Sequence, residues 1–511
     1  MNSSDIVSTM MQVPLSLNHL LDRAGILFPD NEVISRLPDK TYLHHTYGDI
    51  YRRTRQLAQA LTELGLQAGD RVATLCWNHH VHLECYFGIP AAGGVMHTLN
   101  LRLSPDEIAW IVNDAQDRFL IVDDVLLPLL AQFKDNCKFE KIIVVPFTGN
   151  KYSGPELDYE DLLAAANMRA FAYAKHHEDD AVSMCYTSGT TGKPKGVVYS
   201  HRSTLLHTLV GCLSDCWALR SNDVVLPVTP MFHANSWGIP YGALMTGAKL
   251  VFPGPHLHPD DLLDLMQYAP PTLALGVPTI WMGLIQTYET ALRQQPGRWK
   301  LPVGMRSLVG GAAVPESLIR AFDKHGVWIM QGWGMTETSA TCTTHAAEDF
   351  LNRPASCGPV LPVGKLKILC DGVEAPPGVV GELWAFGPNV VKGYWNQWEA
   401  TAETFDNGWL KTGDIGTISA DGFITLVDRK KDMILVSGFN VYPNELEDVV
   451  SKHPGVLECA AVGLPDSKNG EVIKMFVVRK DLALTEAELK DFCRTQLTGY
   501  KVPRHIEFRD D

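Results

Sequence analysis

Short apolar runs alternate with helix-like segments through the first four hundred residues of the chain. Runs of four to eight apolar residues are typical of buried strands, whereas apolar residues that recur every three or four positions are typical of helices. The clearest strand-like runs are residues 71–76, 119–122, 141–145 and 223–227. This alternation predicts an α/β fold with layered, largely parallel sheets, and no internal repeat or low-complexity tract interrupts it.

The pattern changes from Gly378 onward. Short strand-like runs are separated there by turns rich in Gly and Asp, as at residues 406–408 and 420–422. Because such turns join the strands of hairpins, we expect a compact β-rich subdomain over about residues 360–430.

Charged residues 428–432 separate this subdomain from the apolar run 433–436. By itself the charged run could be only a solvated turn. We place a domain boundary within it, so that residues 1–431 form one domain and residues 432–511 another.

The composition is that of a globular protein with more than one core. A chain of 511 residues exceeds the size at which a single core stops growing, and 46% hydrophobic with 20% charged residues is an ordinary balance. The net charge of −14 disfavours nucleic acid and an anionic membrane surface as partners. We therefore expect a small anionic ligand held by a local basic patch.

The cysteines and the N-terminus indicate the compartment. The 11 cysteines are odd in number, scattered and free of C-x-x-C pairs, which favours neither a disulfide framework nor a zinc site. The N-terminus lacks a basic start, and no uninterrupted apolar run reaches about 18 residues. We expect a reduced, cytoplasmic protein without a signal peptide or a transmembrane helix.

Residues 186–196 read Tyr-Thr-Ser-Gly-Thr-Thr-Gly-Lys-Pro-Lys-Gly and are the most informative stretch. Glycines allow close approach to a ligand, hydroxyls and amides can donate to phosphate oxygens, and two lysines add positive charge. The P-loop template fails, because Thr187 replaces its first Gly and Pro194 follows the lysine. A solvated turn is the alternative, but the strand-like runs 181–186 and 196–199 favour a phosphate clamp between buried strands.

Three further segments follow in order. They are residues 331–337 (Gln-Gly-Trp-Gly-Met-Thr-Glu), residues 409–414 (Trp-Leu-Lys-Thr-Gly-Asp) and residues 428–443, which contain Asp-Arg-Lys-Lys-Asp and Ser-Gly-Phe-Asn-Val-Tyr-Pro. Together with the loop they resemble, in order and spacing, the adenylate-forming superfamily of acyl-CoA synthetases, peptide-synthetase adenylation domains and luciferases. Residues 230–237 (Pro-Met-Phe-His-Ala-Asn-Ser-Trp) look most like the medium- or long-chain fatty-acyl-CoA synthetase branch.

The resemblance covers nearly the whole chain and implies its domain organisation. A large N-terminal domain of layered α/β subdomains would be joined to a small mobile α+β lid, which turns about Lys431 between two half-reactions. A carboxylic acid would react with ATP to give an acyl-adenylate, and coenzyme A would then displace AMP.

The resemblance also implies the residues that handle the phosphates. Thr336 would donate to the α-phosphate, Glu337 would bind Mg²⁺ with Thr187 nearby, and Lys193 and Lys195 would hold the β- and γ-phosphates. With Lys431 these form the expected catalytic set, although residues 336–338 could be an ordinary helix start. The loop residues expected at the nucleotide are Thr187, Ser188, Gly189, Thr190, Thr191 and Gly192.

Adenosine would be bound by the later segments. Trp333 offers a flat face for adenine, Asp414 can accept from the ribose hydroxyls, and Arg429 would point at the ribose and phosphate. Trp333 could instead be a core residue, and Asp414 only a turn former. The remaining residues expected at the nucleotide are Gly310, Gly311, Ala312, Gln331, Gly332, Gly334 and Thr336.

The acyl pocket is expected around residues 231–245. His233 and Trp237 are four apart, so on a helical turn they would share one face. The resemblance to the long-chain branch implies that Trp237 is the gate of the acyl tunnel. Both could equally be packed aromatic core. The expected pocket residues are His233, Ala234, Trp237 and Gly311, with Gly238 and Gly242 leaving volume.

Other features carry less weight. Residues 437–439 (Ser437, Gly438 and Phe439) are expected as a strand that lines the coenzyme A path. His79, His80 and His82 invite a metal interpretation with Glu84, but a solvated helix is favoured. Ser188 does not lie in a G-x-S-x-G motif, which disfavours a serine hydrolase.

The superfamily also carries a Gly-Lys segment beyond the position of Asp511, whose lysine bridges carboxylate and phosphate. Either this segment is missing from the sequence or the protein works without that lysine, and Lys501 lies too early to replace it. An adenylation enzyme that feeds a carrier protein and a non-catalytic acyl-adenylate or nucleotide sensor therefore stay open as alternatives. The chain could form a homodimer, and the acid could be aliphatic, aryl or thioether-containing.

Overall fold

The computed structural model describes residues 10–187, 193–345, 349–466 and 469–510. The chain forms two compact units. The first comprises residues 1–212, 219–257 and 394–397, and the second comprises residues 213–218, 258–393 and 398–511.

The first unit contains a predominantly parallel seven-stranded sheet. Its strands, in spatial order, are β7 (Leu157–Asp158), β6 (Lys141–Val145), β5 (Asp117–Asp123), β3 (Arg71–Leu75), β4 (Val95–Thr98), β8 (Ala181–Thr187) and β9 (Lys195–Ser200). Only the β8–β9 pair is antiparallel. The strands predicted at residues 71–76, 119–122, 141–145, 181–186 and 196–199 are confirmed.

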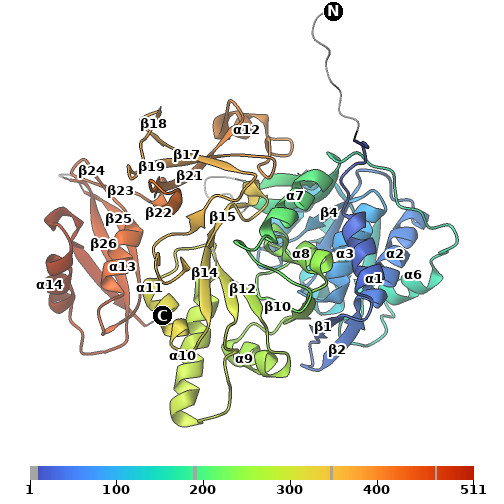
Figure 1. Ribbon diagram of the computed structural model, residues 1–511, viewed down its shortest axis with the longest axis horizontal. Helices are drawn as coiled ribbons and strands as arrows, with labels where there is room; N and C mark the ends of the chain where they lie inside the picture. Colours follow the sequence, from blue (N-terminus) through green and yellow to red (C-terminus); the bar gives the residue numbers. More distant parts are fainter. Residues whose placement is uncertain (1–9, 188–192, 346–348, 467–468, 511) are drawn as a thin grey trace, which may run out of the picture. The chain divides into compact units, whose positions relative to one another are not determined.

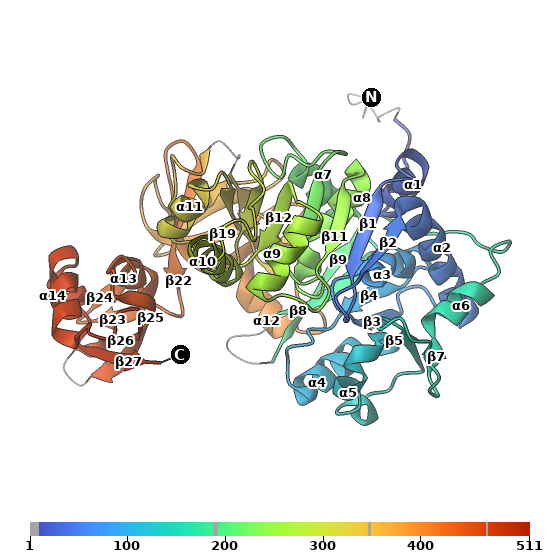
Figure 2. The same cartoon turned by 90° about the horizontal axis from the view of Figure 1, so that it is seen from below.

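Helices cover this sheet, as the buried faces of parallel strands require. Helix α4 (Pro105–Ala115) and the short α5 (Leu127–Leu130) place Ile108, Val112 and Leu130 against apolar residues of β3, β5 and β6. Figure 2 shows α4 and α5 together beside β5. Helix α6 (Tyr159–Ala165) contacts β6 and β7, and α2 (Tyr47–Glu63) packs against α6.

A second group of strands lies in the same unit. Strands β10 (Val224–Pro227), β11 (Lys249–Phe252) and β1 (Glu32–Arg36) are parallel, and β2 (Tyr42–Thr46) runs antiparallel to β1. The strand predicted at residues 223–227 is therefore also confirmed. The accompanying helices are α1 (Asn18–Leu27), α7 (His201–Gly211) and α8 (Ile239–Thr246).

Helix α3 (His80–Ala91) lies between the two groups of strands, and all of its residues are buried. It contacts β1 on one side and β3, β4 and β8 on the other, and it packs beside α1 and α2 (Figure 1). The solvated helix expected at residues 79–82 is therefore wrong. Its polar side chains are satisfied by partners inside the fold: His80 by Ser35, His82 by Thr74, and Glu84 by Arg53 and Tyr159.

The second unit begins with parallel strands β12 (Leu273–Gly276), β13 (Arg306–Val309) and β14 (Trp328–Trp333), followed by the antiparallel β15 (Thr343–Thr344). Helix α9 (Pro259–Tyr268) precedes β12, α10 (Pro278–Gln294) connects β12 to β13, and α11 (Glu316–Asp323) connects β13 to β14. Parallel strands joined through helices extend the α/β architecture that the sequence predicts.

A largely antiparallel sheet follows. It contains β16 (Gly358–Pro359), β22 (Phe423–Arg429), β21 (Trp409–Ile418), β19 (Gly381–Phe386), β17 (Lys365–Cys370) and β18 (Val373–Glu374), with β20 (Phe405–Asp406) paired to β21 and α12 (Trp398–Thr404) before it. Asn407 and Gly408 join β20 to β21 with φ of 49° and 81°. Two positive φ angles are the requirement of a type I′ hairpin turn, so the turn predicted at residues 406–408 is confirmed.

The C-terminal segment has a core of its own. Its strands are β23 (Ile434–Val436), β24 (Phe439–Val441), β25 (Val456–Asp466), β26 (Gly470–Arg479) and β27 (His505–Arg509). Helices α13 (Pro443–Val450) and α14 (Glu486–Gln496) accompany this sheet (Figure 2). Their Leu446 and Leu489 belong to one core with Ile473 and Met475 of the sheet. In the described ranges, every helix is too short or too polar to cross a bilayer.

Candidate functional site

The predicted phosphate loop joins two paired strands in the first unit. Thr187, the last residue of β8, lies opposite Lys195, the first residue of β9. Ser188, Gly189, Thr190, Thr191 and Gly192 lie outside the described residues, so their expected roles stay predictions. The pairing of β8 with β9 therefore brings the two ends of the loop close together.

Both lysines of the loop lie over aromatic rings. The Nζ atom of Lys193 is 5.2 Å from the ring centre of Trp110, and that of Lys195 is 4.8 Å from the ring centre of Tyr394. Ammonium groups at these distances are attracted to the electron-rich ring faces. Trp110 and Tyr394 were not predicted from the sequence, because neither lies in a motif with the lysines.

A short segment from later in the chain fixes the base of the hairpin. Trp395 donates its backbone N–H to Gly196 O at 2.8 Å and its indole N–H to Asp114 O at 3.1 Å. Gln397 donates to Pro194 O at 3.0 Å. Tyr186, just before the loop, also donates to the Asp114 carboxylate at 2.6 Å. These bonds hold both loop ends in place.

The predicted acyl segment forms a left-handed turn. Residues 234–237 (Ala, Asn, Ser and Trp) have φ of 43°, 52°, 49° and 55°, and Gly238 follows at 81°. The helical turn expected between His233 and Trp237 is therefore present but left-handed. L-residues in this region cost roughly 1–2 kcal/mol each, so the surrounding contacts must hold the turn.

The two aromatic residues of the turn differ in environment. Trp237 is 8% exposed, whereas His233 is open to solvent. Protein atoms nevertheless approach the His233 ring closely enough that desolvation, helped by the charge of Arg102, lowers its pKa. A neutral imidazole beside an apolar interior is compatible with the predicted acyl pocket, and the gate role of Trp237 stays a prediction.

In the second unit, predicted nucleotide residues gather at the carboxyl ends of β13 and β14. The strands are parallel, with Val309 opposite Gln331. Residues 310–312 (Gly310, Gly311 and Ala312) follow β13, and Gly332 and Trp333 end β14. Gly310 is buried, whereas Gly311 and Ala312 are exposed. Ligands of open α/β sheets bind at this end of the strands.

The segment after β14 turns sharply. A Cβ atom on Gly334 would lie only 1.6 Å from the carbonyl oxygen of Ala340, so no larger residue fits. Residues 336–338 then form one 3-10 turn instead of a continuing helix, because Ser339 and Ala340 have φ of 58° and 82°.

Hydrogen bonds hold this turn from both sides. The hydroxyl of Thr338 accepts from Met335 N–H at 3.0 Å, and the carbonyl of Thr338 accepts from the side-chain amide of Asn389 at 3.0 Å. The carbonyl of Glu337 accepts from Val391 N–H at 2.9 Å. The turn therefore presents Thr336 and the 6% exposed Glu337 from a fixed backbone.

Trp333, Asp414 and Arg429 form a connected group. The indole N–H of Trp333 donates to the Asp414 carboxylate at 2.7 Å, and Arg429 Nε lies 3.6 Å from the other carboxylate oxygen. Burial raises the pKa of Asp414, and the bond from Trp333 partly opposes this effect. Trp333 also packs among Cys342, Cys357 and Ile368. It is therefore a core residue whose indole N–H binds the Asp414 carboxylate.

The hinge and coenzyme A predictions fall in the C-terminal part. Lys431 is exposed, in the turn between β22 and β23. The strand expected over residues 437–439 is partly wrong: Ser437 and Gly438, with φ of 51° and 85°, form a hairpin turn, and β24 begins at Phe439. Phe439 is 56% exposed and stacks on Tyr500 with 4.8 Å between ring centres.

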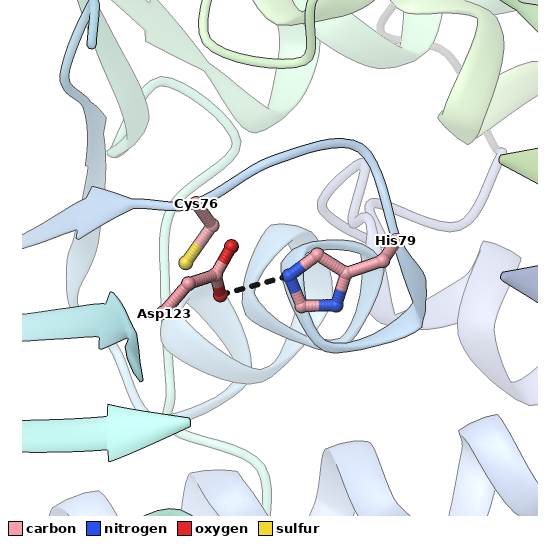
Figure 3. A group of neighbouring side chains, drawn as sticks. All are labelled: Cys76, His79 and Asp123. Carbon is pink, nitrogen blue, oxygen red and sulfur yellow. Dashed lines mark hydrogen bonds and ion pairs between the residues drawn. The ribbon is translucent and has the colours of Figure 1, made fainter. Parts of the chain in front are cut away.

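Cys76, His79 and Asp123 place potential metal-ligand atoms within 4.8 Å of one another (Figure 3). His79 Nδ1 accepts from Val81 N–H, which leaves the proton on Nε2 to be donated to Asp123 at 2.9 Å. The second Asp123 oxygen accepts from Trp77 N–H at 2.8 Å. Burial raises the pKa of the Cys76 thiol, which disfavours the thiolate that binds metals. The cluster is satisfied as a hydrogen-bonded network.

Comparison with known proteins gives matches over nearly the whole chain. The model of a family described as AMP-binding enzyme matches residues 21–395, and that of its C-terminal domain matches residues 445–511. The solved anthranilate CoA ligase AuaEII, in complex with anthranoyl-AMP, superposes with a TM-score of 0.88 at 27% identity, over 98% of this chain and 94% of that one. These matches confirm an α/β fold with a large N-terminal and a small C-terminal domain.

Two relatives are more similar in sequence. The 3-methylmercaptopropionyl-CoA ligase of Ruegeria lacuscaerulensis is 37% identical over 99% of this chain and 95% of the relative. The long-chain-fatty-acid–CoA ligase of Thermus thermophilus is 39% identical over 95% of this chain and 90% of the relative. Both relatives are named as CoA ligases, and their names differ in the carboxylic acid.

Proposed function

Because this chain belongs to the AMP-binding enzyme family of adenylate-forming proteins and is an AMP-forming acyl-CoA ligase, we propose that its acid is a medium- or long-chain fatty acid. The observation that carries the proposal is the stretch from Met231 to Met245. It contains no Lys, Arg, Asp or Glu, and it includes the turn that buries Trp237. A hydrocarbon tail can occupy such a region without leaving a charged group desolvated.

A short thioether acid is a second candidate. It is favoured by the near full-length similarity to the 3-methylmercaptopropionyl-CoA ligase. Such an acid is also uncharged beyond its carboxylate, so the apolar stretch alone does not separate the two candidates.

The reaction has two steps. A carboxylate oxygen bonds to the α-phosphorus of ATP as the bond to pyrophosphate breaks, and the thiol sulfur of coenzyme A then bonds to the acyl carbon as AMP leaves. Lys193 and Lys195 would leave their aromatic partners and neutralise the β- and γ-phosphates, and Thr336 would donate to the α-phosphate. Two anions must meet in the first step, so this neutralisation is the main task of the site.

Glu337 fits the role of a magnesium ligand. Glu337 is nearly buried, and hydrogen bonds from Asn389 and Val391 hold the backbone of its turn. Carboxylate and hydroxyl oxygens are donors that Mg²⁺ accepts, and Thr187 would supply the hydroxyl. When bound, Mg²⁺ would add positive charge at the phosphates.

Adenosine would be held by the second unit. Asp414, kept in place by Trp333, would accept from the ribose hydroxyls, and Arg429 would contact the ribose and α-phosphate. The small residues Gly310, Gly311 and Ala312 would form a wall beside adenine, together with Gln331, Gly332 and Gly334. The Gly311 position would also border the acyl pocket.

The C-terminal domain would act as the lid. It would turn about Lys431 after adenylation and present the Ser437-Gly438 hairpin turn and Phe439 to the pantetheine arm of coenzyme A. Gly438 suits this role because a backbone without Cβ permits close approach. Action as a homodimer and a cytoplasmic location stay predictions.

A panel of carboxylic acids, assayed for coenzyme A-dependent AMP release, tests the proposal. It should contain acids from butanoate to hexadecanoate, a methylthio acid and an aryl acid. We expect the largest kcat/KM for an aliphatic acid of at least eight carbons, and preference for the methylthio or aryl acid would overturn the fatty-acid assignment. AMP release only with a carrier protein, or nucleotide binding without turnover, would favour the alternatives.

A further inference from the structure

Helix α13 is the first helix of the C-terminal domain, and its N-terminus lacks a side-chain cap of its own. Tyr442 occupies the N-cap position, and its side chain makes no bond to the first turn. Helix α14 of the same domain differs, because the Thr485 hydroxyl caps it by accepting from Glu488 N–H at 3.3 Å. The first N–H groups of a helix have no partner within the helix, so those of α13 depend on an acceptor from another element or on water.

Strand β22 of the preceding antiparallel sheet supplies that acceptor. One carboxylate oxygen of Asp428 accepts from the N–H of Asn444, the second residue of α13, at 3.0 Å. The side-chain amide of Asn444 donates in return to the carbonyl of Val427 at 3.1 Å. Two hydrogen bonds therefore join β22 to α13 on either side of the turn that contains Lys431.

The Asp428 carboxylate is fixed by its own strand. Asp428 is 8% exposed, and its other oxygen accepts from Arg429 N–H at 2.7 Å. Burial raises the pKa of Asp428, and the bonds from the Asn444 and Arg429 backbones oppose this effect. A carboxylate at a helix N-terminus is also stabilised by the helix dipole. Asp428 therefore holds α13 from a side chain that is already oriented.

Helix α13 is fixed to the C-terminal domain by separate contacts. The Glu447 carboxylate accepts from Ala461 N–H of β25 at 2.8 Å, and Leu446 belongs to the core of this domain. The helix must therefore move with the domain. Because Asp428 precedes the proposed hinge and Asn444 follows it, rotation about that hinge separates them and breaks both bonds.

We propose that Asp428 and Asn444 form a latch that favours one of the two lid orientations and thereby sets the ratio of the two half-reactions. The inference rests on the proposed function of the C-terminal domain as a lid. Each half-reaction needs its own orientation, so the ratio of their rates follows the equilibrium between the orientations. Loss of an N-cap acceptor corresponds to about 2- to 30-fold in an equilibrium constant.

The test compares the two half-reactions in the same variants. The first rate is acid-dependent exchange of pyrophosphate into ATP, and the second is thioester formation from supplied acyl-adenylate and coenzyme A. Asp428→Ala and Asn444→Ala should change the ratio of these rates in the same direction, the former by about 3-fold or more. Asp428→Asn keeps an acceptor oxygen for the Asn444 N–H, so its ratio should lie closer to that of the wild type.

Thr485→Ala is the matched control. It removes a cap of the same kind, but both partners of that bond lie within the lid, so the ratio should stay at the wild-type value. A shift as large as that of Asp428→Ala would overturn the inference, because it would assign the effect to loss of lid stability.

The other outcomes also decide the inference. Equal slowing of both rates in Asp428→Ala, with only a lowered thermal midpoint, would make the residue structural and overturn the proposal. Opposite shifts in Asp428→Ala and Asn444→Ala would do the same. If Asp428→Ala does not fold, Asn444→Ala, which leaves the carboxylate in place, decides instead.

Failure of the proposed function looks different. It appears as a wild-type chain that activates no acid of the panel and forms no thioester. The latch is then measured by limited trypsin cleavage after Lys430 or Lys431, which are exposed in the turn that it closes. Asp428→Ala should be cleaved there about 2- to 30-fold faster than the wild type, and Thr485→Ala should not. Equal cleavage of all three chains would overturn the inference.

Discussion

Replacement of Gly334 by alanine tests whether the turn after β14 positions the chemistry. The new Cβ would lie 1.6 Å from the Ala340 carbonyl oxygen, 2.7 Å from its carbon and 3.0 Å from the backbone nitrogen of Cys342. Real Cβ contacts begin near 3.0 Å, so the nearest pair must separate by about 1.4 Å. All three neighbours are backbone atoms, and no side-chain rotation can relieve the clash.

The shift would fall on the residues proposed to bind the α-phosphate and Mg²⁺. Gly334 lies two residues before Thr336, and Ala340 lies three residues after Glu337. Misplacement of reacting groups by about 1 Å can reduce a rate by about 10²-fold. We therefore expect Gly334→Ala to lower the rate of adenylation by about 10²-fold or more.

The assay is acid-dependent exchange of pyrophosphate into ATP, with the thermal midpoint measured in parallel. Gly499→Ala is the matched control, because a Cβ there meets no atom within 4 Å and needs no left-handed backbone. It should exchange at nearly the wild-type rate. A Gly334→Ala chain that folds and exchanges pyrophosphate as fast as this control would refute the positioning argument.

Three further predictions concern other parts of the site. Glu337→Gln should slow pyrophosphate exchange by about 10²-fold and alter its magnesium dependence, because the variant loses one carboxylate contact to the metal; an unchanged magnesium titration would contradict the assignment. Lys431→Pro, which fixes φ at the proposed hinge, should reduce thioester formation from supplied acyl-adenylate while AMP binding survives, and equal damage to both would place the hinge elsewhere. Trp237→Ala should shift the chain-length profile while the KM for ATP changes less than about 3-fold, as expected for a residue at the acyl tail and not at the phosphates; an unchanged profile would make Trp237 a core residue only.

The strands were predictable from the sequence because their signal is local. The apolar run at residues 141–145 coincides with β6, and the Asn407-Gly408 pair forms the expected hairpin turn. The adenylate-forming family was equally accessible, because four motifs in order carry it, and the family matches confirm it.

The left-handed acyl turn was not predictable in this way. Ala234, Ser236 and Trp237 have no preference for positive φ, and only Asn235 and Gly238 hint at it. The bonds that hold the turn include the one between Asn235 and Ser183, which are 52 residues apart. The spacing of His233 and Trp237 therefore suggested a helical turn but not its left-handed twist, which the long-range contacts stabilise.

The burial of the histidines at the start of α3 was not predicted either, because it also depends on long-range contacts. A run with three histidines has the composition of a solvated surface. Their partners, among them Ser35 and Thr74, lie on strands that flank the helix, and a single sequence does not show these pairings. Trp110 and Tyr394 were missed likewise, because contact with the lysines joins distant segments.

The burial of α3 on all sides has a consequence for the synthesis of the chain. Residues 80–91 leave the ribosome well before β8 at residues 181–187, which supplies part of their cover. For about a hundred residues of elongation an apolar helix therefore lacks one of its neighbours, and exposed apolar surface of this kind makes nascent chains prone to association. Destabilising substitutions in β8 should therefore first lower the yield of soluble protein and make folding depend on chaperones.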